Sequence, residues 1–234
     1  QKVKHMDFIE LGISKDIVDV LRNTGISEPT PIQIESIPPI KEGKDVIAEA
    51  QTGTGKTLAF MLPIFENIDP EMESVQCLII TPTRELAIQI TDEANKLTNT
   101  KNINILAAYG GKDIGSQIKK LKNSIHMIIA TPGRLLDHIS RDTVDLSKLR
   151  TLVIDEADQM LLMGFKNEVE DIIKETPKTR QTLCFSATLD SAVKKLAYKY
   201  MKNPISISVQ KESVTLDNIK QYVVETTDRN KQEA

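Results

Sequence analysis

The sequence AQTGTGKT, Ala50–Thr57, follows the apolar run DVIA, Asp45–Ala48, and precedes a segment with a helical pattern. A glycine-rich loop between a strand and a helix is typical of a phosphate-binding loop. Gly53 and Gly55 allow backbone torsions that turn successive N–H groups toward one anion, and the N-terminus of the following helix attracts negative charge. The ammonium of Lys56 can reach the phosphates. This stretch therefore predicts a nucleotide-binding domain in which strands and helices alternate.

A second motif, LVIDEAD at Leu152–Asp158, ends an apolar run in two adjacent carboxylates. In an open parallel sheet, ligands bind at the carboxyl ends of the strands. Asp155 and the hydroxyl of Thr57 are suited to hold Mg²⁺ there, largely through water. Glu156 is suited to act as the base that activates a water molecule. Because Ala50 stands where the general loop pattern has its first glycine, the loop alone leaves a chance glycine-rich turn open. Together the two motifs favour a nucleotide-hydrolysing site.

Short apolar runs alternate with helical stretches along the chain. Most runs are apolar at consecutive positions, which is typical of strands buried on both faces of a parallel sheet. We therefore expect a doubly wound, mainly parallel α/β fold with three α/β/α layers. The expected strands are 45–48, 75–81, 103–109, 126–131, 149–155, 181–187 and 205–209, and the expected helices include 84–97, 113–121, 167–175 and 190–201.

Composition narrows the functional classes. The 234 residues include 30 Lys and Arg against 33 Asp and Glu, a formal net charge of −3. This balance excludes a generally basic protein that coats nucleic acid, whereas a local basic groove is compatible with it. Cys77 and Cys184 lie in apolar runs and predict buried thiols in a reducing compartment. No apolar stretch approaches the ~20 residues of a membrane span, and no signal peptide is visible, so we expect a cytoplasmic protein without membrane contact.

With both motifs in one chain, the sequence resembles the first RecA-like domain of a DEAD-box ATP-dependent RNA helicase, over residues 8 to 209. The short segment before Phe8 favours a bacterial-type member. The resemblance implies a P-loop NTPase that uses ATP and Mg²⁺, with catalytic Lys56, Asp155 and Glu156. It implies nucleotide-binding residues in the Q motif GISEPTPIQ, 25–33, in the phosphate-binding loop and just upstream: Phe8, Thr30, Gln33, Gln51, Thr52, Gly53, Thr54, Gly55, Lys56 and Thr57.

Two of these residues have alternative interpretations. The side-chain amide of Gln33 both donates and accepts, so it can match the adenine edge, and the resemblance places Phe8 near the base. Without the resemblance, Phe8 is a core aromatic, and Pro29, Pro31 and Pro38 mark turns around the start of a helix.

Three further strand-to-helix turns resemble the family's RNA-backbone contacts: PTRELAIQ at 82–89, YGG at 109–111 and ATPGR at 130–134. Each turn can present backbone N–H groups or an arginine to phosphates, without reading the base sequence. The implied RNA-binding residues are Pro82, Thr83, Arg84, Glu85, Gly110, Gly111, Thr131, Pro132, Gly133 and Arg134. The alternative for Arg84 and Arg134 is an ordinary surface ion pair.

SATL at 186–189 follows the last core strand. The resemblance implies that Ser186, Ala187 and Thr188 couple the ATP site to the RNA site, whereas chemistry alone also allows these hydroxyls to cap a helix. Leu162 and the Leu-Asp pair after SAT depart from the usual family pattern and leave the subfamily open.

The expected domain organisation is a first RecA-like domain at 1–209, followed at 210–234 by a linker and the first strand of a second RecA-like domain. In the family that second domain supplies an arginine finger, worth about 10³- to 10⁵-fold in rate. We therefore expect this chain to bind ATP but to hydrolyse it slowly, while the complete protein unwinds or remodels short RNA duplexes. The alternatives are a DNA helicase or translocase on the same scaffold, and a nucleotide-gated adaptor without enzymatic activity.

Overall fold

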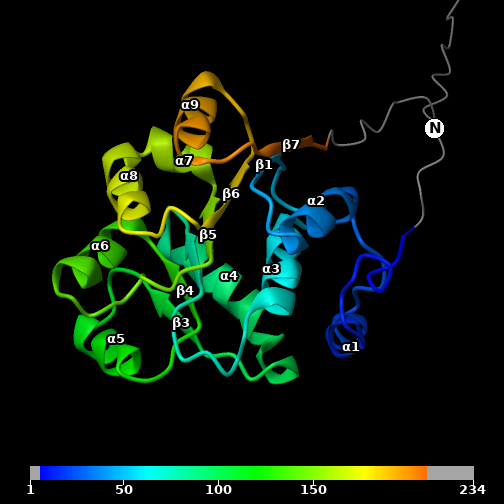
Figure 1. Ribbon diagram of the computed structural model, residues 1–234, viewed down its shortest axis with the longest axis horizontal. Helices are drawn as coiled ribbons and strands as arrows, with labels where there is room; N and C mark the ends of the chain where they lie inside the picture. Colours follow the sequence, from blue (N-terminus) through cyan, green and yellow to red (C-terminus); the bar gives the residue numbers. More distant parts are fainter. Residues whose placement is uncertain (1–5, 210–234) are drawn as a thin grey trace, which may run out of the picture.

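The computed structural model describes residues 6–209, which contain one seven-stranded sheet with the strand order β3-β4-β2-β5-β6-β1-β7 (Figure 1). All six neighbouring pairs are parallel. The strands are β1 (Val46–Glu49), β2 (Cys77–Ile80), β3 (Ile105–Ala108), β4 (Met127–Ala130), β5 (Thr151–Asp155), β6 (Gln181–Ser186) and β7 (Ile205–Ser208). Parallel pairing places the carboxyl ends of all these strands at one edge of the sheet.

The apolar strand residues supply two hydrophobic clusters, one on each face of the sheet. Ile79 and Val153 belong to the first cluster, whereas Leu78 and Leu152 belong to the second. Successive side chains of a strand point to opposite faces, so both clusters draw on the same strands. This double burial explains why the runs are continuously apolar rather than alternating.

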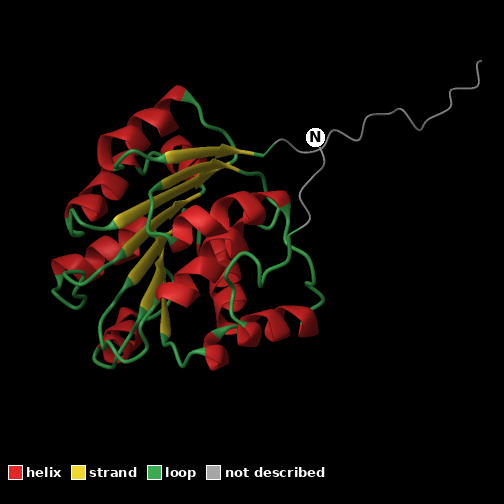
Figure 2. Cartoon of the chain, turned by 45° about the vertical axis from the view of Figure 1, so that its right-hand side comes forward, coloured by secondary structure: helices red, strands yellow, loops and turns green. Residues whose placement is uncertain are grey.

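Helices cover both faces and complete three layers (Figure 2). The first cluster packs under α1 (Lys15–Asn23), α2 (Pro31–Lys41), α3 (Lys56–Asn67) and α4 (Arg84–Asn95). The second cluster packs under α6 (Pro132–Ser140), α7 (Ala157–Leu162), α8 (Lys166–Lys174) and α9 (Ser191–Tyr200). Helix α5 (Ile114–Leu121) lies beside β3, and a 3₁₀ turn at Thr98–Thr100 follows α4. The predicted doubly wound α/β fold is confirmed.

Element ends differ from the sequence prediction by a few residues. The helix expected at 190–201 runs from Ser191 to Tyr200, because Asp190 is its N-cap and accepts a hydrogen bond from the N–H of Val193 at 2.9 Å. The interpretation of Pro38 as a turn marker is wrong, since Pro38 lies inside α2. Proline normally disfavours a helix interior, but α2 packs closely on α3 and buries Ile37 fully. Pro31 does begin the helix, as expected.

Three other expectations concern membrane spans, the two cysteines and the C-terminal segment. No helix in the described part of the chain is long and apolar enough to cross a membrane. Cys77 and Cys184 are free thiols inside the core, as predicted. The predicted linker and extra strand at 210–234 lie outside the described residues.

Candidate nucleotide-binding site

A pocket of about 600 Å³ opens at the carboxyl edge of the sheet. It gathers residues from the start of α2, the phosphate-binding loop, α4 and the end of β5, which lie far apart in sequence. The lining residues are Ile26, Thr30, Gln33, Thr52, Gly53, Gly55, Lys56, Thr57, Leu58, Leu86, Gln89, Ile90, Asp92, Glu93, Asp155 and Glu156. The structure therefore brings together most of the residues predicted to bind nucleotide.

The phosphate-binding loop requires glycine at two positions. Gly53 and Gly55 have φ angles of 83° and 84°, in the left-handed region that L residues rarely adopt. A Cβ atom on Gly55 would lie 2.5 Å from Nε2 of Gln33, whereas a Cβ on Gly53 would meet nothing within 4 Å. Gly55 is also the N-cap residue of α3, so the loop leads directly into the N-terminus of that helix. The loop geometry matches an anion site.

Lys56 lies between the loop and the two carboxylates at the end of β5. Its Nζ is 3.0 Å from Oδ1 of Asp155, and it also donates a hydrogen bond to Oε1 of Glu156. Burial alone would lower the pKa of Lys56, but the charges of Asp155 and Glu156 outweigh burial and raise it. Glu156 has φ 55° and ψ 45°, an uncommon left-handed conformation for a non-glycine residue at a strand-to-helix turn. The lysine is thus charged and held where incoming phosphates would meet it.

Gln33 joins the start of α2 to the phosphate-binding loop. Its Oε1 accepts a hydrogen bond from the backbone N–H of Thr30 at 2.9 Å, and its Nε2 donates to the carbonyl of Gly55 at 3.0 Å. One amide hydrogen of Gln33 is not accounted for by these bonds. Its predicted contact with adenine stays a prediction. Phe8 is 1% exposed, lies in the first hydrophobic cluster and does not line the pocket, as the core-aromatic alternative expects.

Two buried polar atoms at the pocket are available to a ligand. Thr30 Oγ1 has no hydrogen-bond partner among the described residues, and Asp155 Oδ1 has only the ammonium of Lys56, at 3.0 Å, as a partner. Buried polar atoms are normally satisfied, so each exception calls for a partner. No group of three or more His, Cys, Asp or Glu side chains within residues 6–209 forms a metal cage. Mg²⁺ usually takes one or two carboxylates plus phosphate and water oxygens, so Asp155 and Thr57 fit such a site without a cage.

The SAT residues contact the end of the DEAD motif. Ser186 Oγ accepts a hydrogen bond from the N–H of Asp158 at 3.1 Å, and Thr188 Oγ1 donates to Oδ2 of Asp158 at 3.2 Å. The helix-cap alternative is wrong for the helix that follows SAT, because Asp190 caps α9. Ser186 instead satisfies an N–H in the first turn of α7, which connects the ends of β5 and β6. The predicted coupling role stays a prediction.

The three turns predicted to contact RNA lie at the ends of β2, β3 and β4. Arg84 opens α4 and lies over the ring of Tyr109 at 5.3 Å, next to the Gly110–Gly111 turn. Arg134 in α6 donates a hydrogen bond to the carbonyl of Lys112 at 3.0 Å. Within the described residues neither arginine forms an ion pair, so the surface-ion-pair alternative is wrong for this structure.

Sequence reasoning missed the wall that α4 contributes to the pocket. Leu86, Ile90, Asp92 and Glu93 line the pocket beside Gln89. The motif PTRELAIQ contains Leu86 and Gln89, but it was interpreted only as a contact for the RNA backbone. Helical spacing places the later residues on the same face of α4, which was the available signal.

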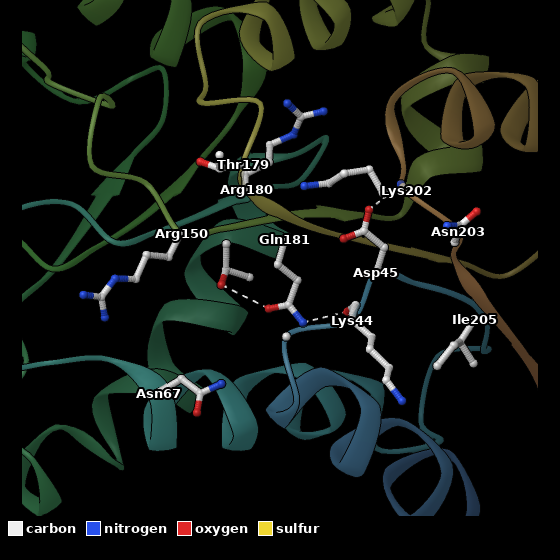
Figure 3. Close-up of a pocket in the computed structure, with 12 residues that line it drawn as sticks. Lys44, Asp45, Asn67, Arg150, Thr179, Arg180, Gln181, Lys202, Asn203 and Ile205 are labelled. Atoms are coloured by element: carbon white, nitrogen blue, oxygen red, sulfur yellow. Dashed lines mark hydrogen bonds between the residues drawn. The ribbon is translucent and has the colours of Figure 1, made fainter.

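A second hollow, of about 820 Å³, lies at the opposite edge, where β1, β5, β6 and β7 begin (Figure 3). Its polar groups join these strands: Gln181 donates to the carbonyl of Lys44 at 2.7 Å, and Asp45 accepts from the N–H groups of Thr182 and Lys202. In Figure 3 the guanidinium of Arg180 points away from the centre of the hollow. This hollow is therefore a structural junction between strands.

Fold and site together define the nucleotide-binding domain of a RecA-like P-loop NTPase. The model of the DEAD/DEAH box helicase family matches residues 30–196, and the chain belongs to this family. The chain is 49% identical over 226 residues to the ATP-dependent RNA helicase CshA of Limosilactobacillus reuteri, covering 97% of the chain and 46% of that protein. It is 45% identical over 224 residues to the DEAD-box ATP-dependent RNA helicase CshA of Bacillus subtilis, covering 96% of the chain and 45% of the relative.

A solved structure shows the same fold. A DEAD box protein from the hyperthermophile Methanococcus jannaschii superimposes with a TM-score of 0.85 at 41% identity, covering 89% of this chain and 57% of that chain. The present chain therefore spans about half the length of the curated relatives it matches, 46% of the relative from Limosilactobacillus reuteri.

Proposed function

We propose that this chain is the first RecA-like domain, residues 1–209, of an ATP-dependent RNA helicase, with 210–234 as the linker and first strand of a second RecA-like domain. The observation that carries the proposal is the position of Lys56, which reaches both Asp155 and Glu156 from the phosphate-binding loop. This constellation is what phosphoryl transfer requires: a cation for the phosphates, a carboxylate for the metal and a second carboxylate for water.

The residues of the pocket divide the work as follows. Lys56 exchanges its carboxylate contacts for the β- and γ-phosphates of ATP, while the N–H groups of the loop and the start of α3 surround them. A bound Mg²⁺, held largely through water by Thr57 and Asp155, would neutralise phosphate charge. Release of Lys56 leaves Glu156 free to orient a water and accept its proton. The unpartnered hydroxyl of Thr30 gives the nucleotide a further hydrogen-bonding partner.

The RNA site lies along the same edge of the sheet. The turns after β2, β3 and β4 present Arg84, Gly110–Gly111 and Arg134 side by side, which suits one strand of RNA held by its backbone. The names of the CshA relatives support RNA as the substrate. The second domain would complete the ATP site and the RNA grip, so this chain alone binds nucleotide but hydrolyses it slowly. The cytoplasmic location expected from the sequence stays a prediction.

The proposal is tested on the full-length protein by RNA-stimulated ATP hydrolysis and by nucleotide binding. Lys56→Ala should weaken triphosphate binding because an ion pair to phosphate is lost. Glu156→Gln should preserve binding and reduce turnover by about 10²- to 10⁴-fold, the usual value of a positioned base. Lys101→Ala is the matched control, since Lys101 donates only to the carbonyls of Phe65 and Glu66, outside the pocket.

Three outcomes would overturn the assignment. Equal loss of binding and turnover in Glu156→Gln would make that residue structural. Stimulation by single-stranded DNA as strong as by RNA of equal sequence would favour the DNA translocase. Absence of turnover with RNA present would favour the nucleotide-gated adaptor. Titration with ADP and GDP, each with Mg²⁺, tests the adenine pocket. ADP should bind more tightly than GDP by roughly 1–3 kcal/mol, because guanine loses the donor–acceptor match to the amide of Gln33.

A further inference from the structure

Gln117 is a buried polar residue at the centre of the predicted RNA-binding edge. It lies in α5, is 2% exposed and is the buried residue of that helix. A buried amide needs hydrogen-bond partners, because an unpaired buried polar group costs stability. Its partners come from two other segments, the end of β3 and helix α6, which carry two of the three turns assigned to RNA.

The contacts of Gln117 reach both turns. Its Nε2 donates to the carbonyl of Tyr109 at 3.2 Å, directly before Gly110 and Gly111. Its Oε1 accepts from Arg134 at 3.4 Å, and the same guanidinium nitrogen donates to the carbonyl of Lys112 at 3.0 Å. Arg134 therefore contacts the carbonyl of Lys112 after the glycine turn directly, and it is linked to the carbonyl of Tyr109 before the turn through Gln117.

His138 completes this arrangement from the next turn of α6. It is 1% exposed, and its Nε2 lies 2.8 Å from Oε1 of Gln117, while its Nδ1 lies 2.8 Å from Oγ1 of Thr143. Since the Oε1 of Gln117 only accepts, the hydrogen-bond pattern assigns the proton of neutral His138 to Nε2. Burial lowers the pKa of His138, and the cation of Arg134 lowers it further. His138 thus fixes the orientation of the amide without adding a charge.

The third turn joins through Tyr109. The guanidinium of Arg84 lies 5.3 Å from the centre of the Tyr109 ring, a cation–π distance. A Cβ on Gly111, whose φ is 86°, would lie 2.9 Å from a guanidinium nitrogen of Arg84. Displacement of the glycine turn would therefore disturb Arg84 as well as Arg134.

We propose that Gln117 is a positioning residue that holds Arg134 and the Gly110–Gly111 turn in one fixed arrangement for the RNA backbone. The inference rests on the proposed RNA binding of this edge. Because Gln117 is buried beneath this edge, we assign it no direct contact with RNA. Its effect passes through Arg134, whose placement it sets, and through the carbonyl of Tyr109.

The experiment uses the full-length protein and the variant Gln117→Leu, which removes both hydrogen-bonding functions at similar volume. Loss of hydrogen bonds to a charged partner should raise the KM for RNA in ATP hydrolysis by about tenfold, with the KM for ATP unchanged. In an Arg134→Ala background the same substitution should have little further effect, because the group it positions is absent. Gln181→Leu is the matched control: Gln181 is also buried, at 9% exposed, and hydrogen-bonded, but it lies at the opposite edge of the sheet.

Each result decides the proposal. An unchanged KM for RNA in Gln117→Leu, an additive effect in the Arg134→Ala background, or an equal effect of Gln181→Leu would overturn it. NMR of the Arg134 side-chain N–H in ¹⁵N-arginine-labelled protein tests the positioning without RNA. Loss of its ordered signal in Gln117→Leu supports positioning, and an unaltered signal refutes it. If RNA does not stimulate ATP hydrolysis by the wild-type protein, the proposed function is refuted. The NMR signal of the Arg134 side chain would still decide whether Gln117 positions Arg134.

Discussion

The close contact between Gly55 and Gln33 makes Gly55→Ala a sharp test of how the phosphate-binding loop is held. A methyl group there would lie 2.5 Å from Nε2 of Gln33 and 2.9 Å from Oγ1 of Thr30. Two costs follow. The left-handed backbone costs about 1–2 kcal/mol for a non-glycine residue. Displacement of Gln33 breaks its bonds to Thr30 and Gly55, each worth about 0.5–1.5 kcal/mol net. We expect Gly55→Ala to lower the free energy of unfolding by about 2–5 kcal/mol.

Gly53→Ala is the matched control, because Gly53 has the same positive φ but open space around its Cβ position. It should cost only the torsional part, about 1–2 kcal/mol. Urea unfolding of both variants without nucleotide measures the difference, which we expect to be about 1–3 kcal/mol larger for Gly55→Ala. Equal losses would show that the bond from Gln33 to the loop adds no stability, and would refute the reasoning.

Two further predictions concern helices α8 and α9. Glu170 accepts hydrogen bonds from Lys199 at 2.7 Å and Tyr200 at 2.5 Å, which hold the pKa of Glu170 at about 2. This lowered pKa adds stability above pH 4.5 that disappears as the pH falls toward 2, so Glu170→Gln should flatten the loss of Tm over that window. An unchanged slope would contradict this. Asp190→Ala should remove the cap of α9 and cost about 1 kcal/mol, seen as a Tm lower by about 2–4 °C, whereas Ser191→Ala should leave Tm unchanged.

The sheet was predictable from sequence because its strands are buried on both faces. All seven expected strands are present, including the weakest, 205–209, which pairs with β1. Helix α2 was harder to predict, since Pro38 locally favours a turn, whereas in the fold α2 packs on α3, β1 and β7. A local rule of this kind fails where tertiary contacts outweigh intrinsic preference.

The charged residues of the site were more predictable than the buried glutamines that are hydrogen-bonded to the glycine turns. Lys56, Asp155 and Glu156 follow from motif and position, because parallel strands bring their carboxyl ends together. The bond from Gln33 to Gly55 spans 22 residues, and no periodicity in the sequence announces it. Gln117 was hidden for a similar reason: a polar residue within an amphipathic helix is expected on the wet face.

Gln33 and Gln117 share one physical feature: each is a buried glutamine that is hydrogen-bonded to a glycine turn, and we propose that both turns bind phosphates. Gln33 donates to the carbonyl of Gly55 at the ATP side, and Gln117 donates to the carbonyl of Tyr109 before the glycine turn at the RNA side. A glycine turn can approach a phosphate closely because it lacks side chains, but the same feature leaves its backbone free to move. A neutral amide restrains the carbonyl without adding a charge near the phosphate. A buried carboxylate or ammonium would add such a charge and disturb phosphate binding. We therefore expect backbone-directed binding at both glycine turns to depend on amides that hold the turn.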